Sequence, residues 1–226
     1  MPLVLDHVFA FVAPALSEVA RLEAAGFVVT PPHGHPGQGT ANRCVMFPNA
    51  YLELIHLASR AEAEANVMRL DRRADFTSTG ECPFGIGLRG TLTDAERAAF
   101  WPYEPPYRKP GGPPIWIHRE TSEVAGLPLV FVVEQRGESL DPDAFRPDHR
   151  ADVAAIRALA HRTPVRGLAG VDIQVPDARG WPLGIDVPGV RVEAGGPYRL
   201  HVLLDAEGLG PLNLSAHLEL RPTAGA

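Results

Sequence analysis

Residues 35–57, HPGQGTANRCVMFPNAYLELIHL, are the stretch that decides the fold. A loop rich in glycine and histidine leads into two strand-like segments, 41–47 and 51–57, which are joined by a Pro-Asn turn. The second segment carries a glutamate, Glu53, inside an otherwise apolar strand. A charged side chain that faces the protein interior is costly unless it is paired, hydrogen-bonded or bound to a metal. Glu53 is therefore a first candidate for chemistry.

The preceding residues complete a recognisable unit around this stretch. Residues 5–12, LDHVFAFV, have the β-branched and aromatic composition of a buried strand and carry His7. Residues 17–25 follow a helical period, and residues 27–30 are expected to form a short strand before two prolines. The predicted order is a strand, a helix and three strands, which is a βαβββ module.

A related order recurs further along the chain. Residues 82–89, 115–117 and 129–133 are strand-like, and a short helix is expected at 93–100. The segment WPYEPPYRKPGGPP, which follows that helix, is interpreted as a loop because of its proline and glycine content. This region therefore resembles a second, degenerate module.

A short internal repeat extends the pattern to the C-terminal region. SAHLELRP at 215–222 resembles NAYLELIH at 49–56 and aligns Glu219 with Glu53, although chance similarity between two amphipathic strands is the alternative. The predicted organisation is a first βαβββ module at 1–57, a connecting helix at 58–81, a second, degenerate module at 82–135, a linker and helix at 136–166, and a β-rich partial module at 167–226.

Composition excludes several classes of protein. The chain has 226 residues, a formal net charge of -6 and no cluster of basic residues, so nucleic acid is not an expected partner. Cys44 and Cys82 are isolated and cannot build a zinc framework or a disulfide scaffold. The apolar N-terminus lacks a basic region and is interpreted as a strand, and no apolar run suits a membrane helix. We expect a cytoplasmic, soluble protein with no membrane partner.

Three motifs together resemble a known family. The pair Asp6-His7, the loop HPGQGTANR at 35–43 and the strand YLELI at 51–55 are similar to the signature of the glyoxalase-like domain family, within the vicinal-oxygen-chelate superfamily. The resemblance is strongest over residues 3–57 and looser to about 135. It implies an α+β fold in which repeated βαβββ modules form curled mixed sheets, a half-barrel cup that holds a small ligand.

The resemblance also implies a metal site. Many superfamily members bind a divalent metal through a first-strand histidine and a fourth-strand glutamate, which correspond to His7 and Glu53 here. A second module often supplies the matching pair. In this chain Phe84 is expected in register with His7, and the acid comes late, at Glu134. The site is therefore half complete, which makes a divalent metal doubtful, and no other cofactor is expected.

His7 and Glu53 leave two interpretations open. Period-two alternation places them on faces that can meet in the cup. They can act as catalytic base or metal ligands, since a histidine beside a carboxylate titrates near neutral pH. Alternatively they form a buried hydrogen bond that fixes strand register.

Four further residues are candidate ligand-binding groups. His35 lies in the glycine-rich loop, which suits a pocket rim, although an exposed turn is the alternative. Asn42 and Arg43 follow in the next strand, where an arginine would suit a carboxylate or would pair with a buried acid such as Glu53. Trp116 is a candidate pocket wall or a core residue.

Two other motifs are given structural interpretations. GIGLRG at 85–90 formally matches a dinucleotide fingerprint, but its context is poor, so we expect glycines that let a strand pass its neighbours. His201 and Glu219 are not expected to copy the first site, because no loop like HPGQGTANR precedes them.

The function expected first is binding of a small polar molecule, carboxylated or carbonyl-bearing, in the cup, with isomerase- or lyase-type proton transfer. The alternative is a metal-free protein that binds or sequesters a small molecule. A third possibility is a scaffold that dimerises through a strand edge, since fold does not fix function. The expected partners are therefore a small-molecule ligand and a homodimer mate.

Overall fold

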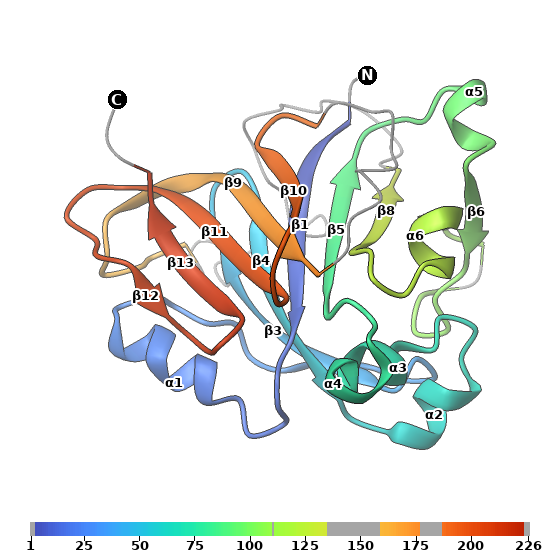
Figure 1. The fold of residues 1–226 in the computed structure, drawn as a ribbon, viewed down its shortest axis with the longest axis horizontal. Coiled ribbons are helices and arrows are strands. Elements are labelled where there is room, and N and C mark those ends of the chain that lie inside the picture. The colour runs from blue at the N-terminus through green and yellow to red at the C-terminus, as the bar shows by residue number, and fades with distance from the viewer. Residues whose placement is uncertain (1–2, 110, 135–158, 177–186, 224–226) are drawn as a thin grey trace.

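Two mixed, curled sheets pack face to face in the computed structural model, which describes residues 3–109, 111–134, 159–176 and 187–223 (Figure 1). The larger sheet has the strand order β2-β3-β4-β1-β5-β8-β7-β6, and the smaller has the order β10-β9-β11-β13-β12. Neither order closes into a barrel. The fold is α+β, with the half-barrel form that the sequence predicts.

The strand bounds are as follows. The larger sheet comprises β1 Val4–Phe11, β2 His33–His35, β3 Thr40–Met46, β4 Tyr51–Leu57, β5 Phe84–Arg89, β6 Phe100–Tyr103, β7 Ile115–His118 and β8 Leu129–Val133. The smaller sheet comprises β9 Val165–Val175, β10 Val190–Ala194, β11 Arg199–Ala206, β12 Leu212–Asn213 and β13 Leu218–Pro222.

The larger sheet consists of two halves related by a local twofold axis. Strand β1 runs parallel to β4, and β5 runs parallel to β8, while β1 and β5 are antiparallel at the centre. Val8 lies opposite Ile86, and the flanking pairs are His7 with Gly87 and Phe9 with Gly85. A rotation about the Val8–Ile86 pair therefore exchanges the two halves.

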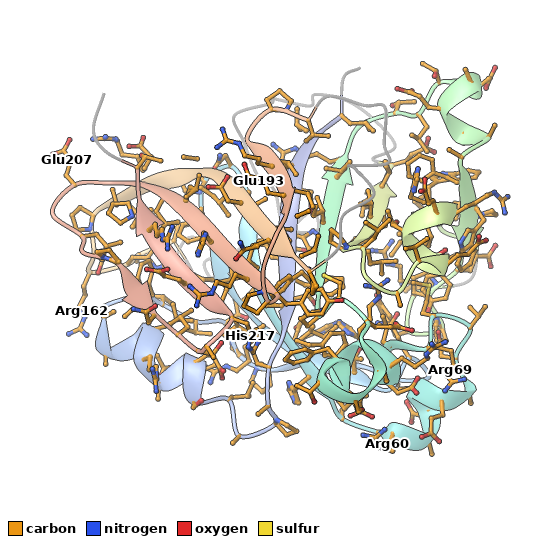
Figure 2. All side chains as sticks on the ribbon, viewed as in Figure 1. Arg60, Arg69, Arg162, Glu193, Glu207 and His217 are labelled. Atoms are coloured by element: carbon orange, nitrogen blue, oxygen red, sulfur yellow. The ribbon has the colours of Figure 1, made fainter. Side chains whose placement is uncertain are left out.

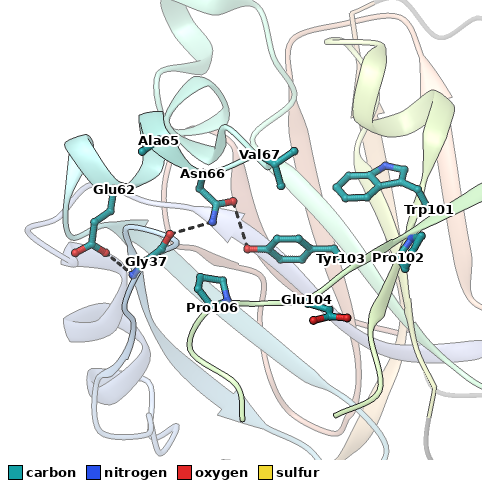
Figure 3. A pocket seen from close by; sticks show the side chains of 10 residues that line it. All are labelled: Gly37, Glu62, Ala65, Asn66, Val67, Trp101, Pro102, Tyr103, Glu104 and Pro106. Carbon is teal, nitrogen blue, oxygen red and sulfur yellow. Dashed lines mark hydrogen bonds between the residues drawn. The ribbon is translucent and has the colours of Figure 1, made fainter. Parts of the chain in front are cut away.

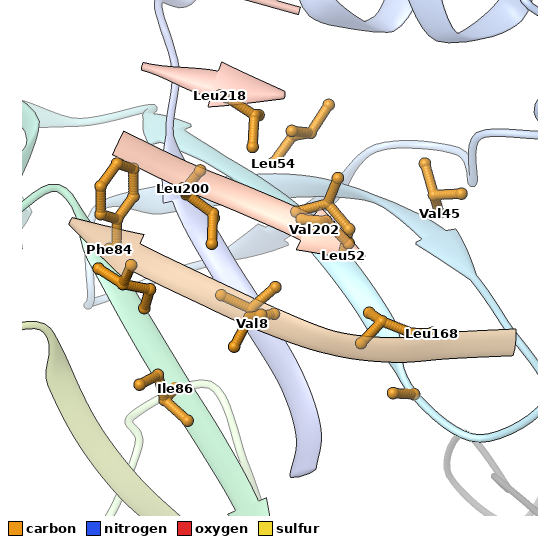
Figure 4. Close-up of a cluster of buried hydrophobic side chains, with 14 of the residues drawn as sticks. Val8, Val45, Leu52, Leu54, Phe84, Ile86, Leu168, Leu200, Val202 and Leu218 are labelled. Atoms are coloured by element: carbon orange, nitrogen blue, oxygen red, sulfur yellow. The ribbon is translucent and has the colours of Figure 1, made fainter. Parts of the chain in front are cut away.

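The two faces of the larger sheet have different tasks. Its core face packs on the smaller sheet through fully apolar side chains (Figure 4). Contacts in this core join Val8, Val45, Leu52, Leu54, Phe84 and Ile86 of the larger sheet to Leu168, Leu200, Val202 and Leu218 of the smaller sheet. Its site face carries His7 and Glu53 and a second apolar cluster, which includes Phe9, Phe11, Ile55, Leu70 and Phe131.

The helices are short and lie around the sheets. They are α1 Ser17–Ala24, α2 Arg60–Ala65, α3 Leu70–Ala74, α4 Phe76–Thr79, α5 Asp94–Arg97 and α6 Arg119–Glu123. The helix expected at 17–25 is confirmed as α1. The single connecting helix expected at 58–81 is instead three helices, α2 to α4, and the linker expected at 136–166 lies largely outside the described residues. None of the helices in the described ranges is long and apolar enough to cross a bilayer.

Two strand predictions are wrong for identifiable reasons. Residues 27–30 form no strand, because they do not continue the backbone hydrogen-bond ladder of a sheet. The Cys44 N–H donates to the side-chain Oγ1 of Thr30 at 2.8 Å, not to a backbone carbonyl. Residues of the expected loop form β6, an edge strand, where Pro102 is tolerated since one side needs no hydrogen-bond partner.

The glycines of GIGLRG are explained by packing. Gly85 and Gly87 lie on the site face of β5, opposite Phe9 and His7. A Cβ atom at Gly85 would overlap the Phe9 ring, and one at Gly87 would overlap the His7 ring. The expectation that these glycines let a strand pass its neighbours is therefore confirmed.

Asn49 ties the two sheets together at the turn between β3 and β4. Its side-chain oxygen accepts the N–H of Leu168 at 2.9 Å, and its amide nitrogen donates to the carbonyl of Leu168 at 2.8 Å. The side chain thereby pairs with Leu168 as a neighbouring strand would. This contact fixes the smaller sheet against the larger one.

His161 joins two backbone segments of the first half. The Val28 N–H donates to its Nδ1 at 2.9 Å, and its Nε2 donates to the Met46 carbonyl at 2.7 Å. Both contacts require the neutral ring with its proton on Nε2. Burial lowers the pKa of His161 below its ordinary value, and the Met46 carbonyl only partly opposes this effect.

The stability of the protein should therefore depend on His161 in mildly acidic solution. A folded-state pKa below the unfolded value of 6.5 gives a stabilisation that is present above that pH and is lost as the pH falls below it. We expect the free energy of unfolding, measured in urea, to fall between pH 7.5 and pH 5 by more in the wild type than in His161→Gln. Equal pH dependence in both proteins would contradict this assignment.

Candidate functional site

A chain of polar contacts crosses the site face from β1 to β3. His7 Nδ1 lies 2.7 Å from Asp6 Oδ1, and His7 Nε2 lies 3.6 Å from Glu53 Oε2. Asn42 Nδ2 donates to Glu53 Oε1 at 2.6 Å and lies 3.4 Å from His35 Nε2. The structure thus brings together four of the residues singled out in the sequence.

Strand register explains this convergence. In the parallel pair of β1 and β4, Phe9 lies opposite Glu53, which places His7 diagonally across from the carboxylate on the same face. In the antiparallel pair of β3 and β4, Cys44 lies opposite Glu53, so Asn42 is its diagonal neighbour on the other side. The motif spacing therefore sets the geometry of the site.

His7 is held tightly in place. The Tyr51 ring stacks on it at a centroid distance of 4.3 Å, and the edge of Phe131 approaches at 5.2 Å. Gly87 leaves the room that the imidazole occupies. The ring thus lies between two carboxylates, with Nδ1 facing Asp6 and Nε2 facing Glu53.

His35 is held in its neutral form. Burial lowers the pKa of His35, and the nearby negative charge of Glu53 opposes this effect only in part. Its Nδ1 lies 2.9 Å from Thr40 Oγ1, and Tyr107 stacks on its ring at 4.7 Å. A neutral ring with Nδ1–H donating to Thr40 leaves Nε2 free to accept from the Asn42 amide.

The polar chain continues past His35 toward the surface. Gln38 Nε2 donates to Thr40 Oγ1 at 3.1 Å, and the Tyr103 hydroxyl donates to Gln38 Oε1 at 3.0 Å. Tyr103 also lies 3.3 Å from Asn66 Oδ1. An open groove of about 630 Å³ lies at this end of the chain (Figure 3). His7 and Glu53 do not line the groove.

Arg43 and Trp116 lie away from this network. Arg43 donates from Nε to the Thr30 carbonyl at 2.8 Å and lies 3.4 Å from Glu23 of α1, so it is not aimed into the cup. Trp116 packs against the core-face cluster, with the guanidinium carbon of Arg97 4.5 Å from its ring centroid. Both side chains alternate with residues of the site face and point the other way.

Sequence reasoning gave no role to two charged residues near His7, Asp6 of the Asp6-His7 motif and Arg89. Asp6 is buried and bonds to His7. Arg89 is buried too, with its Nη1 2.9 Å from the Asn49 carbonyl and 3.9 Å from Asp6 Oδ2. Asp6 could have been identified from the sequence, because it is a charged residue next to a histidine within an apolar strand. The same argument points to Glu53.

The register expected for the second half is wrong by one residue. Phe84 lies on the core face, not beside His7 (Figure 4). The twofold axis through Val8 and Ile86 maps His7 onto Gly85 and maps Glu53 onto Phe131. Glu134 follows the last residue of β8 and pairs with Arg97 at 2.8 Å.

The residues of this face do not fit a resident divalent metal. His7 Nε2 and Glu53 Oε2 are two donors, while the symmetry-related positions, Gly85 and Phe131, offer none. Within the described ranges, no group of three or more His, Cys, Asp or Glu side chains is arranged to hold a metal ion. A catalytic metal usually has about three protein ligands.

A second histidine–glutamate pair lies on the smaller sheet. His201 on β11 lies opposite Glu219 on β13, and their Nε2 and Oε2 atoms are 3.6 Å apart. Sequence reasoning did not expect this copy of the first pair. Arg221 donates to Glu219 at 2.8 Å and neutralises its carboxylate. In this respect the Glu219 carboxylate differs from the Glu53 carboxylate.

Comparisons with known proteins agree with this architecture. The model of the glyoxalase-like domain family matches residues 5–181. A hypothetical protein from Staphylococcus aureus shares the fold, with a TM-score of 0.55 and 14% identity over 99% of this chain and 100% of that chain.

A methylmalonyl-CoA epimerase from Mycobacterium tuberculosis aligns with a TM-score of 0.39 and 18% identity over 59% of this chain and 89% of that chain. A search of curated proteins found no match. Because the family model spans most of the chain, this protein belongs to the glyoxalase-like domain family.

Proposed function

We propose that this protein binds a small carbonyl- or carboxyl-bearing molecule at the site face and that His7 moves a proton on it. The observation that carries the proposal is the Asp6–His7 pair, 2.7 Å apart, with the Glu53 carboxylate on the far side of the ring. A carboxylate on Nδ1 fixes the tautomer and stabilises the imidazolium that forms when Nε2 takes a proton.

The proton transfer is metal-independent in this proposal. His7 Nε2 takes a proton from a carbon next to a carbonyl and returns it to the same or a neighbouring carbon. The Glu53 carboxylate, 3.6 Å from Nε2, stabilises the positive charge that the ring carries while it holds the proton. Asn42 orients Glu53, since its amide donates to the other carboxylate oxygen. Arg43 points away, so strong oxyanion stabilisation is not part of the proposal.

Access to these groups requires side-chain movement. His7 is 5% exposed and Glu53 is 7% exposed. The rings closest to the network are Tyr51 on His7 and Tyr107 on His35. A ligand therefore reaches Nε2 only when neighbouring side chains move. The same burial would keep water from the proton-transfer step.

Deuterium exchange tests the proposal directly. We expect the protein to accelerate exchange of the C–H protons next to the carbonyl in a panel of 2-oxo acids and hydroxyketones in D2O, followed by proton NMR. His7→Gln is expected to lower the rate by about 10²–10⁴-fold, as for loss of a general base. Glu53→Gln should lower it as well.

The matched control is His33→Gln. This exposed histidine lies in the same hairpin but outside the polar chain, so the variant should exchange at the wild-type rate. Circular dichroism confirms that each variant is folded. Absence of exchange across the panel, or equal rates in the His7 and His33 variants, would reject proton transfer.

A second candidate function is binding or sequestration without chemistry. It is supported by the apolar half of the site face, where Phe131 and Leu129 occupy the second half. Such a surface suits an apolar or amphipathic molecule. A ligand that raises the melting temperature of the wild type and of His7→Gln equally, with no proton exchange, would favour this alternative.

A further inference from the structure

We propose that the open groove between α2 and β6 binds an organic cation with an apolar body, such as a quaternary or primary ammonium compound. The groove has a volume of about 630 Å³, which lies within the usual range of small-molecule sites. It is separate from the proton-transfer site, so this inference goes beyond the proposed function.

The walls of the groove are aromatic and apolar. Trp101 and Tyr103 lie next to each other, with ring centroids 6.1 Å apart and planes at 70°. Val67 faces them and is 69% exposed, the largest value among the exposed large hydrophobic side chains of the described residues (Figure 3). Aromatic faces attract cations, and an exposed apolar side chain in a groove offers surface to a ligand.

Two carboxylates give the groove a negative charge. Glu62 and Glu104 line it, and across the described residues no basic side chain lies within 4.0 Å of either carboxylate. Within the described ranges, the Glu62 carboxylate accepts one hydrogen bond, from the backbone N–H of Gly37 at 2.6 Å. A bound cation would supply the missing positive charge.

Two arginines near the groove already have acidic partners. Arg60 pairs with Asp75 at 2.8 Å, and Arg69 pairs with Asp71 at 3.0 Å; both lie at the edge of the molecule (Figure 2). These two arginines are therefore engaged elsewhere. Arg108 and Lys109 follow Glu104 along the chain but do not line the groove.

The groove is also preformed. The Asn66 amide donates to the Gly37 carbonyl at 2.9 Å, and the Tyr103 hydroxyl lies 3.3 Å from Asn66 Oδ1 (Figure 3). Trp101 Nε1 lies 3.3 Å from Ser122 Oγ, which fixes the indole. These contacts join α2, the 36–39 turn and β6, so little ordering is needed when a ligand binds.

Three probes that share a phenyl ring test the proposal: benzyltrimethylammonium, benzyl alcohol and benzoate. Binding is measured by calorimetry and by tryptophan fluorescence, with Trp101→Phe to assign the signal. We expect the cation to bind about tenfold tighter than benzyl alcohol, and benzoate to bind weakest. The affinity for the cation should fall as salt is raised.

Glu104→Gln and Glu62→Gln should each weaken binding of the cation by about threefold to tenfold. The matched control is Glu64→Gln, an exposed carboxylate on α2 that does not line the groove and should change affinity by less than about twofold. Equal affinity for the cation and the alcohol, or equal weakening by the Glu64 and Glu104 variants, would overturn the proposal. His7→Gln should leave cation binding unchanged, so failure here is distinct from failure of the proton-transfer site.

Discussion

Replacing Gly39 with alanine is expected to lower the free energy of unfolding by about 2–5 kcal/mol. Gly39 has a φ of 77°, a left-handed conformation that L-residues adopt only at a cost. A Cβ atom there would also overlap the backbone of Ser59 and Ala63, at the start of α2. The helix must then move, and its contacts with the hairpin weaken. Urea unfolding monitored by circular dichroism measures the loss.

The control for this substitution lies five residues earlier in the same hairpin. At Gly34 an added Cβ would have no atom within 4 Å, and its φ is not positive. Gly34→Ala should therefore change the free energy of unfolding by less than about 1 kcal/mol. Similar losses in the two variants would show that general loop stiffness, not close approach of α2, governs the effect.

Arg73→Met is expected to destabilise the protein by about 3–5 kcal/mol. Arg73 is 3% exposed, and its guanidinium donates to the carbonyls of Cys82, Leu127 and Thr121 at 2.8–3.0 Å. Methionine matches the length of the side chain but leaves three buried carbonyls without a donor. Chemical unfolding again gives the measurement.

The adjacent arginine supplies the control. Arg72 is half exposed, and among the described residues it pairs with Glu81 at 2.7 Å. An ion pair with an exposed partner contributes little, so Arg72→Met should cost less than about 1 kcal/mol. If both methionine variants lose the same stability, the carbonyl contacts of Arg73 do not hold the connection between α3 and β5.

The parts of the fold with strong local patterns could be predicted from the sequence. Helix α1 follows a clear helical period, and β4 and β8 are apolar runs of strand length. Strand β6 could not be predicted, because a proline argues against a strand unless the strand is known to lie at the edge of the sheet. That position depends on the order of the whole sheet. Helices α2 to α4 cannot be told apart in the sequence, because their breaks at 66–69 and 75 carry no proline or glycine.

A contact in the site was predictable when both of its residues lie in one motif. Glu53 and Asn42 lie in the same hairpin, and their approach follows from its register. The facing of Arg43 was not fixed, because a one-residue change in register moves a strand side chain to the other face. The same slip explains why Phe84, rather than Gly85, is expected at the position equivalent to His7.

The twofold relation between the two halves also limits how the site could evolve. A histidine at position 85 and a glutamate at position 131 would restore four symmetric donors around the axis. The first of these changes meets an obstacle, since the Phe9 ring already occupies the space above Gly85. Phe9 would have to become smaller before a side chain at 85 could be accepted. A substitution at Phe9 must therefore come before one at Gly85. This constraint makes the asymmetry of the two halves easier to keep than to reverse.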